Sequence, residues 1–245
     1  MSNEKIKVIA ISGFKGSGKD TIARMIEEYM YEQNNIQDAK NDDMPHRPVT
    51  NIVRVFSMAK SIRDIVETAF SLKEPEYGKK EENNELWSKR LKRNVSYRDF
   101  VNTVGTTMRK LYGNKIWVWK AETELEDFRE NIEFNKQFFK TGGIHGIFVI
   151  PDIRYKQEIK MLQRLKKDYD VEHWLVLRKE CLPEWARMGL HVTDPVERKI
   201  ILKDFKPSIH ESDWCLANPK FSRVITNDGT YEELYAKIYD IMSNM

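Results

Sequence analysis

Cysteine is scarce in this chain, and the few cysteines present form no recognisable framework. The 245 residues include only Cys181 and Cys215. Their spacing matches neither a metal-ligand pattern nor a disulfide scaffold, so we expect two reduced thiols in a cytoplasmic protein. No apolar run is long enough to span a membrane. Residues 1–7 are polar and run straight into an apolar segment, so we expect no signal peptide.

The chain also lacks a strong excess of charge of either sign. Lys and Arg together number 41 and Asp and Glu 38, which gives a formal net charge of +3 at pH 7. A protein whose main partner is nucleic acid usually carries a clear basic stripe, so we expect neither a nucleic-acid nor a membrane partner. Hydrophobic residues make up 40% of the chain, enough for a sizeable core in one α/β domain.

Apolar strands and amphipathic helices alternate along the sequence. Helical periodicity fills the segments between the strands, and Ser96 with Asp99, and likewise Thr230 with Glu233, have the spacing of capping boxes. The mixed-charge stretch 73–94 predicts a solvated helix or loop. This alternation predicts a three-layer α/β fold, with a parallel five-stranded sheet, helices on both faces and a site at the carboxyl ends of the strands. Short apolar runs predict the strands at 7–12, 51–56, 146–150, 171–177 and 223–226.

The strongest motif is GFKGSGKDT, residues 13–21, which joins the first predicted strand to the following helix. Its glycines permit positive φ and a close approach of the backbone to phosphate. Exposed N–H groups and a helix N-terminus then form an anion site, and Lys19 adds a charge that reaches the β- and γ-phosphates of a nucleotide. The alternative is a glycine-rich turn without a ligand. We expect nucleotide contacts from Gly13, Lys15, Gly16, Ser17, Gly18, Lys19, Asp20 and Thr21.

The residue after the lysine departs from the usual phosphate loop. Most such loops place Ser or Thr directly after the lysine as a Mg²⁺ ligand, whereas this chain has Asp20 there and the hydroxyl one position later, on Thr21. We expect Thr21 to contact an ATP phosphate. Asp20 either acts on Mg²⁺ through water or caps the helix. The predicted metal-facing set is therefore Asp20, Thr21 and Asp152, in part through water.

A second constellation follows the third predicted strand, the apolar run GIFVI. Asp152 stands at the carboxyl end of this strand, where an acidic residue can orient Mg²⁺ or its waters. Arg154, two residues on, would point into the same crevice and could bind an acceptor phosphate through two parallel hydrogen bonds. The alternatives are a turn cap for Asp152 and a surface residue for Arg154.

Other basic and aromatic residues are candidates for the same crevice. Lys60 and Arg63 lie on the helix after the second strand, and Arg109 lies on the helix that Ser96 begins. Arg178 opens a charged segment in which an arginine could stabilise charge on a transferred phosphoryl group. For all of these, a solvated charge is the competing interpretation. Trp117 could stack on a base or pack in the core.

The chain resembles the deoxynucleoside monophosphate kinases of bacteriophages. The resemblance lies in GFKGSGKDT, FSMAKSIRD, YRDFVNTVGTTMRKLYGNKIWVWKA, VIPDIRYKQE, HESDW and VITNDGTYEELYAKI, which occur in that order over nearly the whole chain. It implies a phosphate-loop nucleoside monophosphate kinase fold, ATP and Mg²⁺ as cofactors, and deoxynucleoside monophosphates as acceptors. If the chain is phage-encoded, the host cytoplasm is the expected location. The oligomeric state, monomer or homodimer, stays open.

The resemblance also assigns roles to particular residues and segments. It supports Arg109, Trp117, Asp152, Arg154 and Glu211 near the acceptor. It places Asn227, Asp228 and Gly229 beside the adenine of ATP. It implies one kinase domain over residues 1–245, with an acceptor-binding helical insertion at about 57–140 and a lid-like segment at about 178–208.

Three competing functions remain open at this point. A kinase for phosphomevalonate or dephospho-coenzyme A would use a similar loop, because a fold does not fix the acceptor. A nucleotide-dependent switch is disfavoured because the chain has no NKxD base-reading motif. A polynucleotide end kinase is disfavoured by the balanced charge.

Overall fold

The computed structural model describes residues 5–39, 51–76, 79–139, 145–189 and 220–245. Contacts between residues divide the chain into two compact units. The first, which we call the sheet unit, comprises Met1–Phe56 and Glu124–Met245. The second, the helical unit, comprises Ser57–Thr123. Each unit is described by itself.

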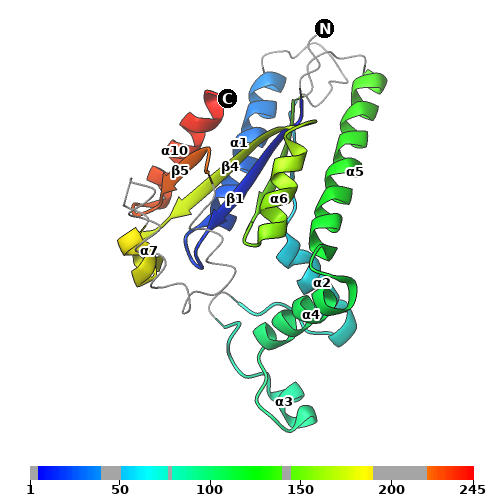
Figure 1. Ribbon diagram of the computed structural model, residues 1–245. Coiled ribbons are helices and arrows are strands. Elements are labelled where there is room, and N and C mark those ends of the chain that lie inside the picture. The colour runs from blue at the N-terminus through cyan, green and yellow to red at the C-terminus, as the bar shows by residue number, and fades with distance from the viewer. Residues whose placement is uncertain (1–4, 40–50, 77–78, 140–144, 190–219) are drawn as a thin grey trace. The chain divides into compact units, whose positions relative to one another are not determined.

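The sheet unit is built on five parallel strands, as the sequence predicts (Figure 1). Their order across the sheet is β2-β3-β1-β4-β5, which places the strand before the glycine-rich loop in the centre. Apolar runs that are buried on both faces favour this parallel arrangement. Because all strands are parallel, the loops after them meet at one edge of the sheet. The strands are β1 (Lys7–Gly13), β2 (Asn51–Val55), β3 (His145–Pro151), β4 (Asp170–Leu177) and β5 (Arg223–Thr226).

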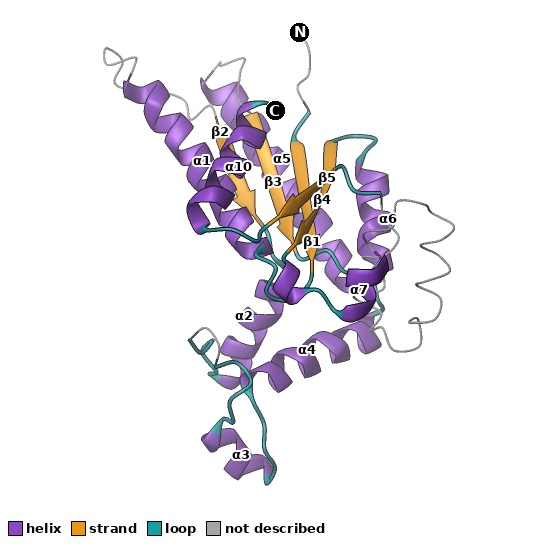
Figure 2. Ribbon diagram, turned by 90° about the vertical axis from the view of Figure 1, so that its left-hand side faces the viewer, coloured by secondary structure: helices purple, strands orange, loops and turns teal. Residues whose placement is uncertain are grey.

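Helices cover both faces of this sheet, which confirms the three-layer α/β class. Helices α1 (Lys19–Ala39) and α10 (Tyr231–Ser243) share one buried core with β1, β3, β4 and β5. On the other face, α6 (Lys156–Leu165) packs on β4. The second half of α5 (Ile116–Phe139) packs on β3 through Phe128 and Phe148, whose ring centroids are 5.5 Å apart. Figure 2 shows α1 and α10 on one side of the strands and α6 on the other.

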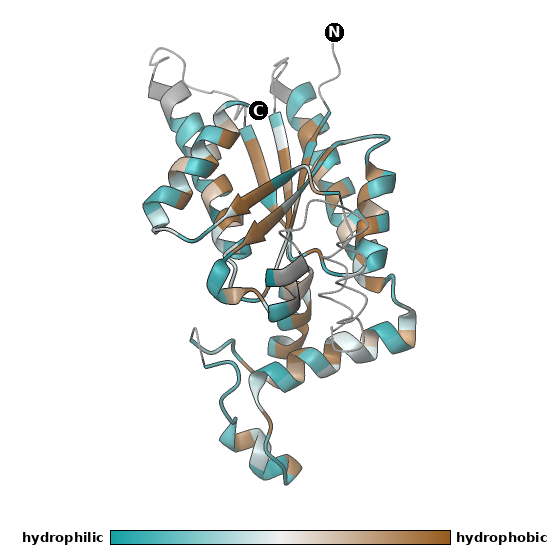
Figure 3. Cartoon of the chain, turned by 60° about the vertical axis from the view of Figure 1, so that its left-hand side comes forward, coloured by the Kyte–Doolittle hydropathy of each residue, from teal (hydrophilic) through white to brown (hydrophobic). Residues whose placement is uncertain are grey.

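Local sequence explains where several of these helices begin. Thr230 and Glu233 form the predicted capping box of α10, and Ser96 and Asp99 form that of α4 (Tyr97–Tyr112). In each box, the side chain of the first residue accepts from the backbone N–H of the third helical residue, whose carboxylate accepts in return. Figure 3 shows the apolar residues gathered on the strands and the polar ones on the outer helix faces.

The helical unit contains α2 (Met58–Phe70), α3 (Glu85–Leu91), α4 (Tyr97–Tyr112) and the start of α5. Helices α2 and α4 pack together, and Gly105 allows α4 to lie close to Ile62. Phe70, Trp87 and Phe100 form an aromatic cluster with ring centroids 5.1 to 5.9 Å apart. The stretch 73–94 contains the short helix α3, which has no fully buried residue, in keeping with the predicted solvated segment.

Two further short helices follow β4. They are a 3-10 turn, η1 (Lys179–Cys181), and α7 (Glu184–Gly189). Among the described residues, no helix has the length and apolar character needed to cross a membrane.

Candidate phosphate-binding site

The glycine-rich motif forms a tight turn between β1 and α1. Gly16 has φ +81° and Gly18 has φ +100°, values that residues with a side chain rarely adopt. The turn is closed by a hydrogen bond from Ser17 N to Phe14 O, 3.1 Å long, and α1 starts with Ile22 N donating to Gly18 O at 3.0 Å. The turn therefore leads directly into the N-terminus of a 21-residue helix, the arrangement that favours phosphate.

The side chain of Asn227, the residue directly after β5, hydrogen-bonds to this turn. Asn227 Nδ2 donates to Ser17 O at 2.9 Å, and a Cβ on Gly18 would lie 2.4 Å from the same nitrogen. Gly18 is thus required by close packing as well as by its φ. Asp228 accepts from Lys179 N at 2.7 Å, which ties η1 to the loop after β5. The predicted contacts of Asn227 and Asp228 with adenine stay predictions. In the structure, each of these side chains hydrogen-bonds to a backbone group.

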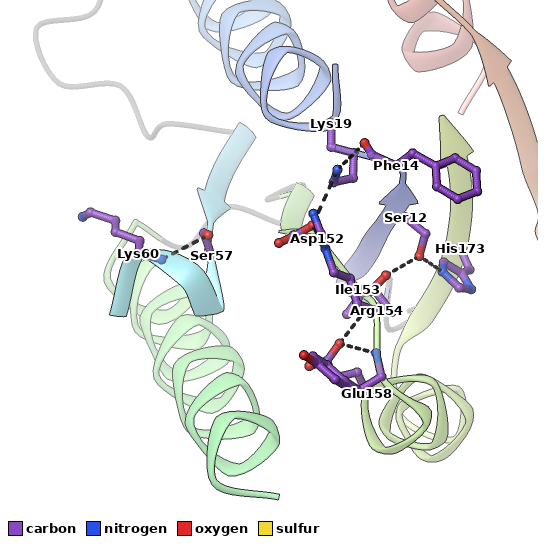
Figure 4. A network of polar contacts seen from close by, with 11 residues as sticks. Ser12, Phe14, Lys19, Ser57, Lys60, Asp152, Ile153, Arg154, Glu158 and His173 are labelled. Atoms are coloured by element: carbon purple, nitrogen blue, oxygen red, sulfur yellow. Dashed lines mark hydrogen bonds and ion pairs between the residues drawn. The ribbon is translucent and has the colours of Figure 1, made fainter. Parts of the chain in front are cut away.

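Lys19 is buried, with only 6% of its surface exposed. Its ammonium donates to Phe14 O at 3.0 Å and lies 3.5 Å from Asp152 Oδ1 (Figure 4). Burial lowers the pKa of Lys19. The positive charge of Arg154 acts in the same direction, whereas Asp152 acts against them. A phosphate oxygen bound by Lys19 would compete with two partners that are already close.

Asp152 and Arg154 stand directly after β3, beside the loop. Arg154 Nε lies 2.5 Å from Asp152 Oδ1, so this one carboxylate oxygen contacts both cations. The structure thus brings together Lys19, Asp152 and Arg154, as the sequence predicts for the carboxyl edge of the sheet. Asp152 has φ +76°, a left-handed conformation that only Asp, Asn and His adopt with any frequency among residues that have a side chain.

The four backbone N–H groups from Asp152 to Tyr155 are all hydrogen-bonded. The N–H groups of Asp152 and Ile153 both donate to Ile11 O, at 2.8 and 3.0 Å. The next two N–H groups, of Arg154 and Tyr155, donate to Glu158 Oε2 at 2.7 and 2.9 Å. Glu158 is buried and belongs to the first turn of α6. An irregular segment can stay in one conformation when its polar groups are satisfied in this way.

The sequence does not predict two more residues of this network. Ser12 Oγ donates to Ile153 O at 2.7 Å and lies 2.7 Å from His173 Nε2 (Figure 4). Burial lowers the pKa of His173 to about 4, and Lys166 acts in the same direction. The available signal was a serine near the end of one strand and a histidine beside Glu172 in another. That signal does not reveal that the two residues meet.

The loop has features that fit a phosphate ligand. Ser17 is fully buried, and its hydroxyl has no hydrogen-bond partner among the described residues. An unpaired buried hydroxyl is costly, and a ligand oxygen would satisfy it. Together with Lys19, the positive φ values and the helix N-terminus, this hydroxyl makes the turn suited to an anion.

The residues present also fit Mg²⁺ bound together with a nucleotide. Such sites use one or two carboxylates, phosphate oxygens and water, and need no all-protein cage. In line with this, no group of three or more His, Cys, Asp or Glu side chains in the described part of the chain could hold a metal alone. Asp20 is exposed in the first turn of α1, Thr21 is half-buried beside it, and Asp152 stands across the loop.

Four of the predicted acceptor residues lie in the helical unit. Lys60 is exposed in the first turn of α2, Arg63 pairs with Glu74 at 3.1 Å, and Arg109 lies in the last turn of α4. Trp117 is buried, with 4% of its surface exposed, and its indole N–H has no hydrogen-bond partner among the described residues. Burial favours core packing over stacking for this ring.

Two other predicted residues belong to the lid-like and acceptor-facing segments. Arg178 follows β4 and pairs with Glu180 at 3.0 Å, on a side chain that is 44% exposed. Glu211 lies outside the described residues, as does most of the predicted lid. The roles assigned to both remain predictions.

Comparisons with known proteins add little to this geometry. No family model matches the chain, and no curated protein matches it. Among solved structures, one similar chain is a "putative kinase" from Chloroflexus aurantiacus, with 10% identity, a TM-score of 0.41, and coverage of 99% of this chain and 97% of that one. Another is APE1195, with 17% identity, a TM-score of 0.36 and coverage of 99% and 97%. A third is a mutant of the Mycobacterium tuberculosis APS kinase CysC, with 10% identity, a TM-score of 0.37 and coverage of 98% and 99%. Similarity at this level carries no argument about activity.

Proposed function

We propose that the protein is a kinase that transfers the terminal phosphoryl group of ATP to a deoxynucleoside monophosphate. One observation carries this proposal. Lys19, from a glycine-rich turn, and Asp152 and Arg154, from the end of the neighbouring strand, meet at the carboxyl edge of a parallel sheet. A phosphate-binding lysine, a carboxylate and an arginine are the groups that phosphoryl transfer requires for positioning and charge stabilisation.

The donor half of the reaction falls to the loop. Its backbone and the α1 N-terminus would hold the ATP phosphates, and Lys19 would bind the β- and γ-phosphate oxygens. Asp152, helped by Asp20 or Thr21, would hold Mg²⁺, which neutralises charge on the phosphates when bound. Because Lys19 is buried, its contact with a phosphate oxygen is shielded from water and correspondingly strong.

Arg154 would serve the acceptor phosphate. Its guanidinium is held beside Asp152 on a hydrogen-bonded backbone, so it can meet an incoming phosphate with little reorganisation. A planar guanidinium can hold two phosphate oxygens at once and so fix the angle of attack. Arg178 would add positive charge as the transferred group moves, after exchanging its present partner Glu180.

The choice of a deoxynucleotide rests on the family resemblance and on the helical unit. Lys60, Arg63 and Arg109 would supply charge for the acceptor. Trp117, a buried ring of the helical unit, is the candidate for packing against the deoxyribose of the acceptor. A ring packed where a 2′-hydroxyl would sit removes water from that hydroxyl without replacing its hydrogen bonds, and so disfavours ribonucleotides.

A coupled assay of ADP release with a panel of acceptors tests the proposal. We expect dGMP, dTMP, dCMP and dAMP to be used about 10- to 100-fold better in kcat/KM than GMP, UMP, CMP and AMP. Trp117→Phe should reduce this preference. Trp119→Phe, an exposed neighbour on the same helix, should leave the preference unchanged. If phosphomevalonate or dephospho-coenzyme A is the preferred acceptor, the proposed acceptor class is wrong. ADP release that needs no acceptor would indicate a nucleotide-hydrolysing switch.

A further inference from the structure

Ser12 and His173 are buried polar residues in strands made mostly of apolar residues. Ser12 is 1% exposed on β1, and His173 is 6% exposed on the adjacent strand β4. Neither residue belongs to the loop motif or to the Asp152 segment. Buried polar side chains are costly unless they are hydrogen-bonded, so a pair of them at the core of a sheet calls for an explanation.

The hydrogen bonds of this pair have a defined direction. Ser12 has one hydroxyl proton, and the carbonyl of Ile153 can only accept, so that proton is donated to Ile153 O. The proton in the 2.7 Å contact between Ser12 and His173 then has to come from the imidazole. His173 is therefore the tautomer that carries hydrogen on Nε2, and the chain of bonds runs from His173 through Ser12 to Ile153 O (Figure 4).

The end of this chain lies on the residue next to Asp152. The peptide unit that carries Ile153 O begins at the Cα of Ile153, immediately after the left-handed Asp152. Ile11 O receives the N–H groups of Asp152 and Ile153 from the other side. Asp152 thus keeps an unfavourable backbone conformation between one carbonyl that accepts from it and one hydroxyl that fixes the following residue. Its carboxylate oxygen Oδ1 lies 3.5 Å from Lys19 Nζ.

We propose that Ser12 and His173 are positioning residues, which hold the Asp152 carboxylate at the place where it meets nucleotide-bound Mg²⁺. This inference rests on the proposed function, because it assigns Asp152 a role in binding ATP with Mg²⁺. The two residues touch neither substrate nor metal. They act through the backbone of Ile153, in the way that outer partners orient the residues that contact a metal.

The first test uses ADP binding, which needs no acceptor and no turnover. In the wild type, Mg²⁺ should increase the affinity for ADP, measured by titration calorimetry with and without the metal. Ser12→Ala removes the hydroxyl and should reduce the Mg²⁺-dependent part of the affinity about 10- to 100-fold. Affinity for ADP without metal should change little, because the loop and Lys19 remain.

Conservative variants separate hydrogen bonding from packing. His173→Gln places a side-chain N–H near the position of Nε2 and should keep most of the Mg²⁺ effect. His173→Phe keeps the ring volume beside Phe221, whose centroid is 4.7 Å away, but lacks the donor and should behave like Ser12→Ala. Ser12→Thr retains the hydroxyl and should restore function. Ser222→Ala is the matched control, because Ser222 Oγ accepts from His173 N at 3.1 Å and takes no part in the chain of bonds to Ile153.

Turnover gives a second, independent measurement. In Ser12→Ala and His173→Phe, kcat/KM for ATP measured with Mg²⁺ should fall about 10- to 100-fold, through a lower kcat and through the weaker Mg²⁺-dependent binding. Thermal unfolding identifies the variants that fold. If Ser12→Ala does not fold, the result for His173→Phe tests the positioning role. Folded variants with the wild-type kcat and the wild-type Mg²⁺ effect would overturn the positioning role alone. A wild-type protein that binds no ADP would overturn the proposed function as well.

Discussion

The charged side chains at the carboxyl edge of the sheet are more buried than those in the helical unit. Lys19 and Asp152 have side chains that are 7% and 25% exposed, and the backbone around them is hydrogen-bonded to buried groups. In the helical unit, Arg63 and Glu74 pair with side chains that are 28% and 37% exposed, and Arg98 and Glu81 are still more open. Buried and tightly held charge marks a site that is organised in advance. Surface pairs contribute little and identify no site.

The largest effect should come from removing the buried charge of the loop. Lys19→Ala should lower kcat by about 10³-fold, because Lys19 is the buried charge of the loop, predicted to bind the β- and γ-phosphates, whereas Lys15 is exposed. The fold should persist, since the sheet does not depend on the ammonium. Steady-state kinetics together with circular dichroism will check both points, and a folded variant with the wild-type kcat would remove the phosphate-loop assignment.

Arg154→Ala should impair the use of the acceptor and leave the use of ATP nearly unchanged. We expect kcat/KM for the acceptor to fall about 10- to 100-fold, because a charged hydrogen bond to phosphate is lost. KM for ATP should stay nearly constant. Varying each substrate in turn measures the two effects separately. A rise in KM for ATP alone would mean that Arg154 belongs to the donor side.

The buried imidazole should make stability depend on pH. The pKa of His173 is lowered from 6.5 to about 4, so the unfolded chain takes up a proton at higher pH than the folded one. Stability from this group is therefore fully present above about pH 6.5 and is lost as the pH falls toward 4. Between pH 7 and pH 5 the loss should be roughly 2 kcal/mol. Denaturant unfolding at both pH values should show a correspondingly smaller loss in His173→Phe.

The smallest effect should come from the helical unit. Glu74→Gln removes the shared partner of Arg63 and Lys80 at a partly exposed position and should change the free energy of unfolding by less than about 1 kcal/mol. The same denaturation experiment measures it. A loss of several kcal/mol would contradict the contrast between the two units, because the pair would then behave like a buried one.

The sequence predicts the sheet and the loop because their signals are local. Each of the five strands is an apolar run, and the capping boxes of α4 and α10 depend on residues three positions apart. The glycines at 16 and 18 indicate the turn directly, since positive φ is the reason for glycine there.

The residues that support the site are far apart in the sequence, so the sequence does not predict that they meet. Ser12 and His173 are separated by 161 positions, and only the pairing of β1 with β4 brings them together. Asn227 illustrates the same limit. Its place after a strand predicts a nucleotide contact, and no nearby residue indicates that its side chain donates to Ser17 O.

Transfer of labelled phosphate tests the central claim most directly. The protein should be incubated with ATP labelled at the γ-phosphate, Mg²⁺ and each deoxynucleoside monophosphate, and the products separated by chromatography. The account predicts label in a deoxynucleoside diphosphate for the wild type and at least about 10³-fold less for Lys19→Ala. Label that stays in ATP, or that appears only as inorganic phosphate with every acceptor, would contradict it.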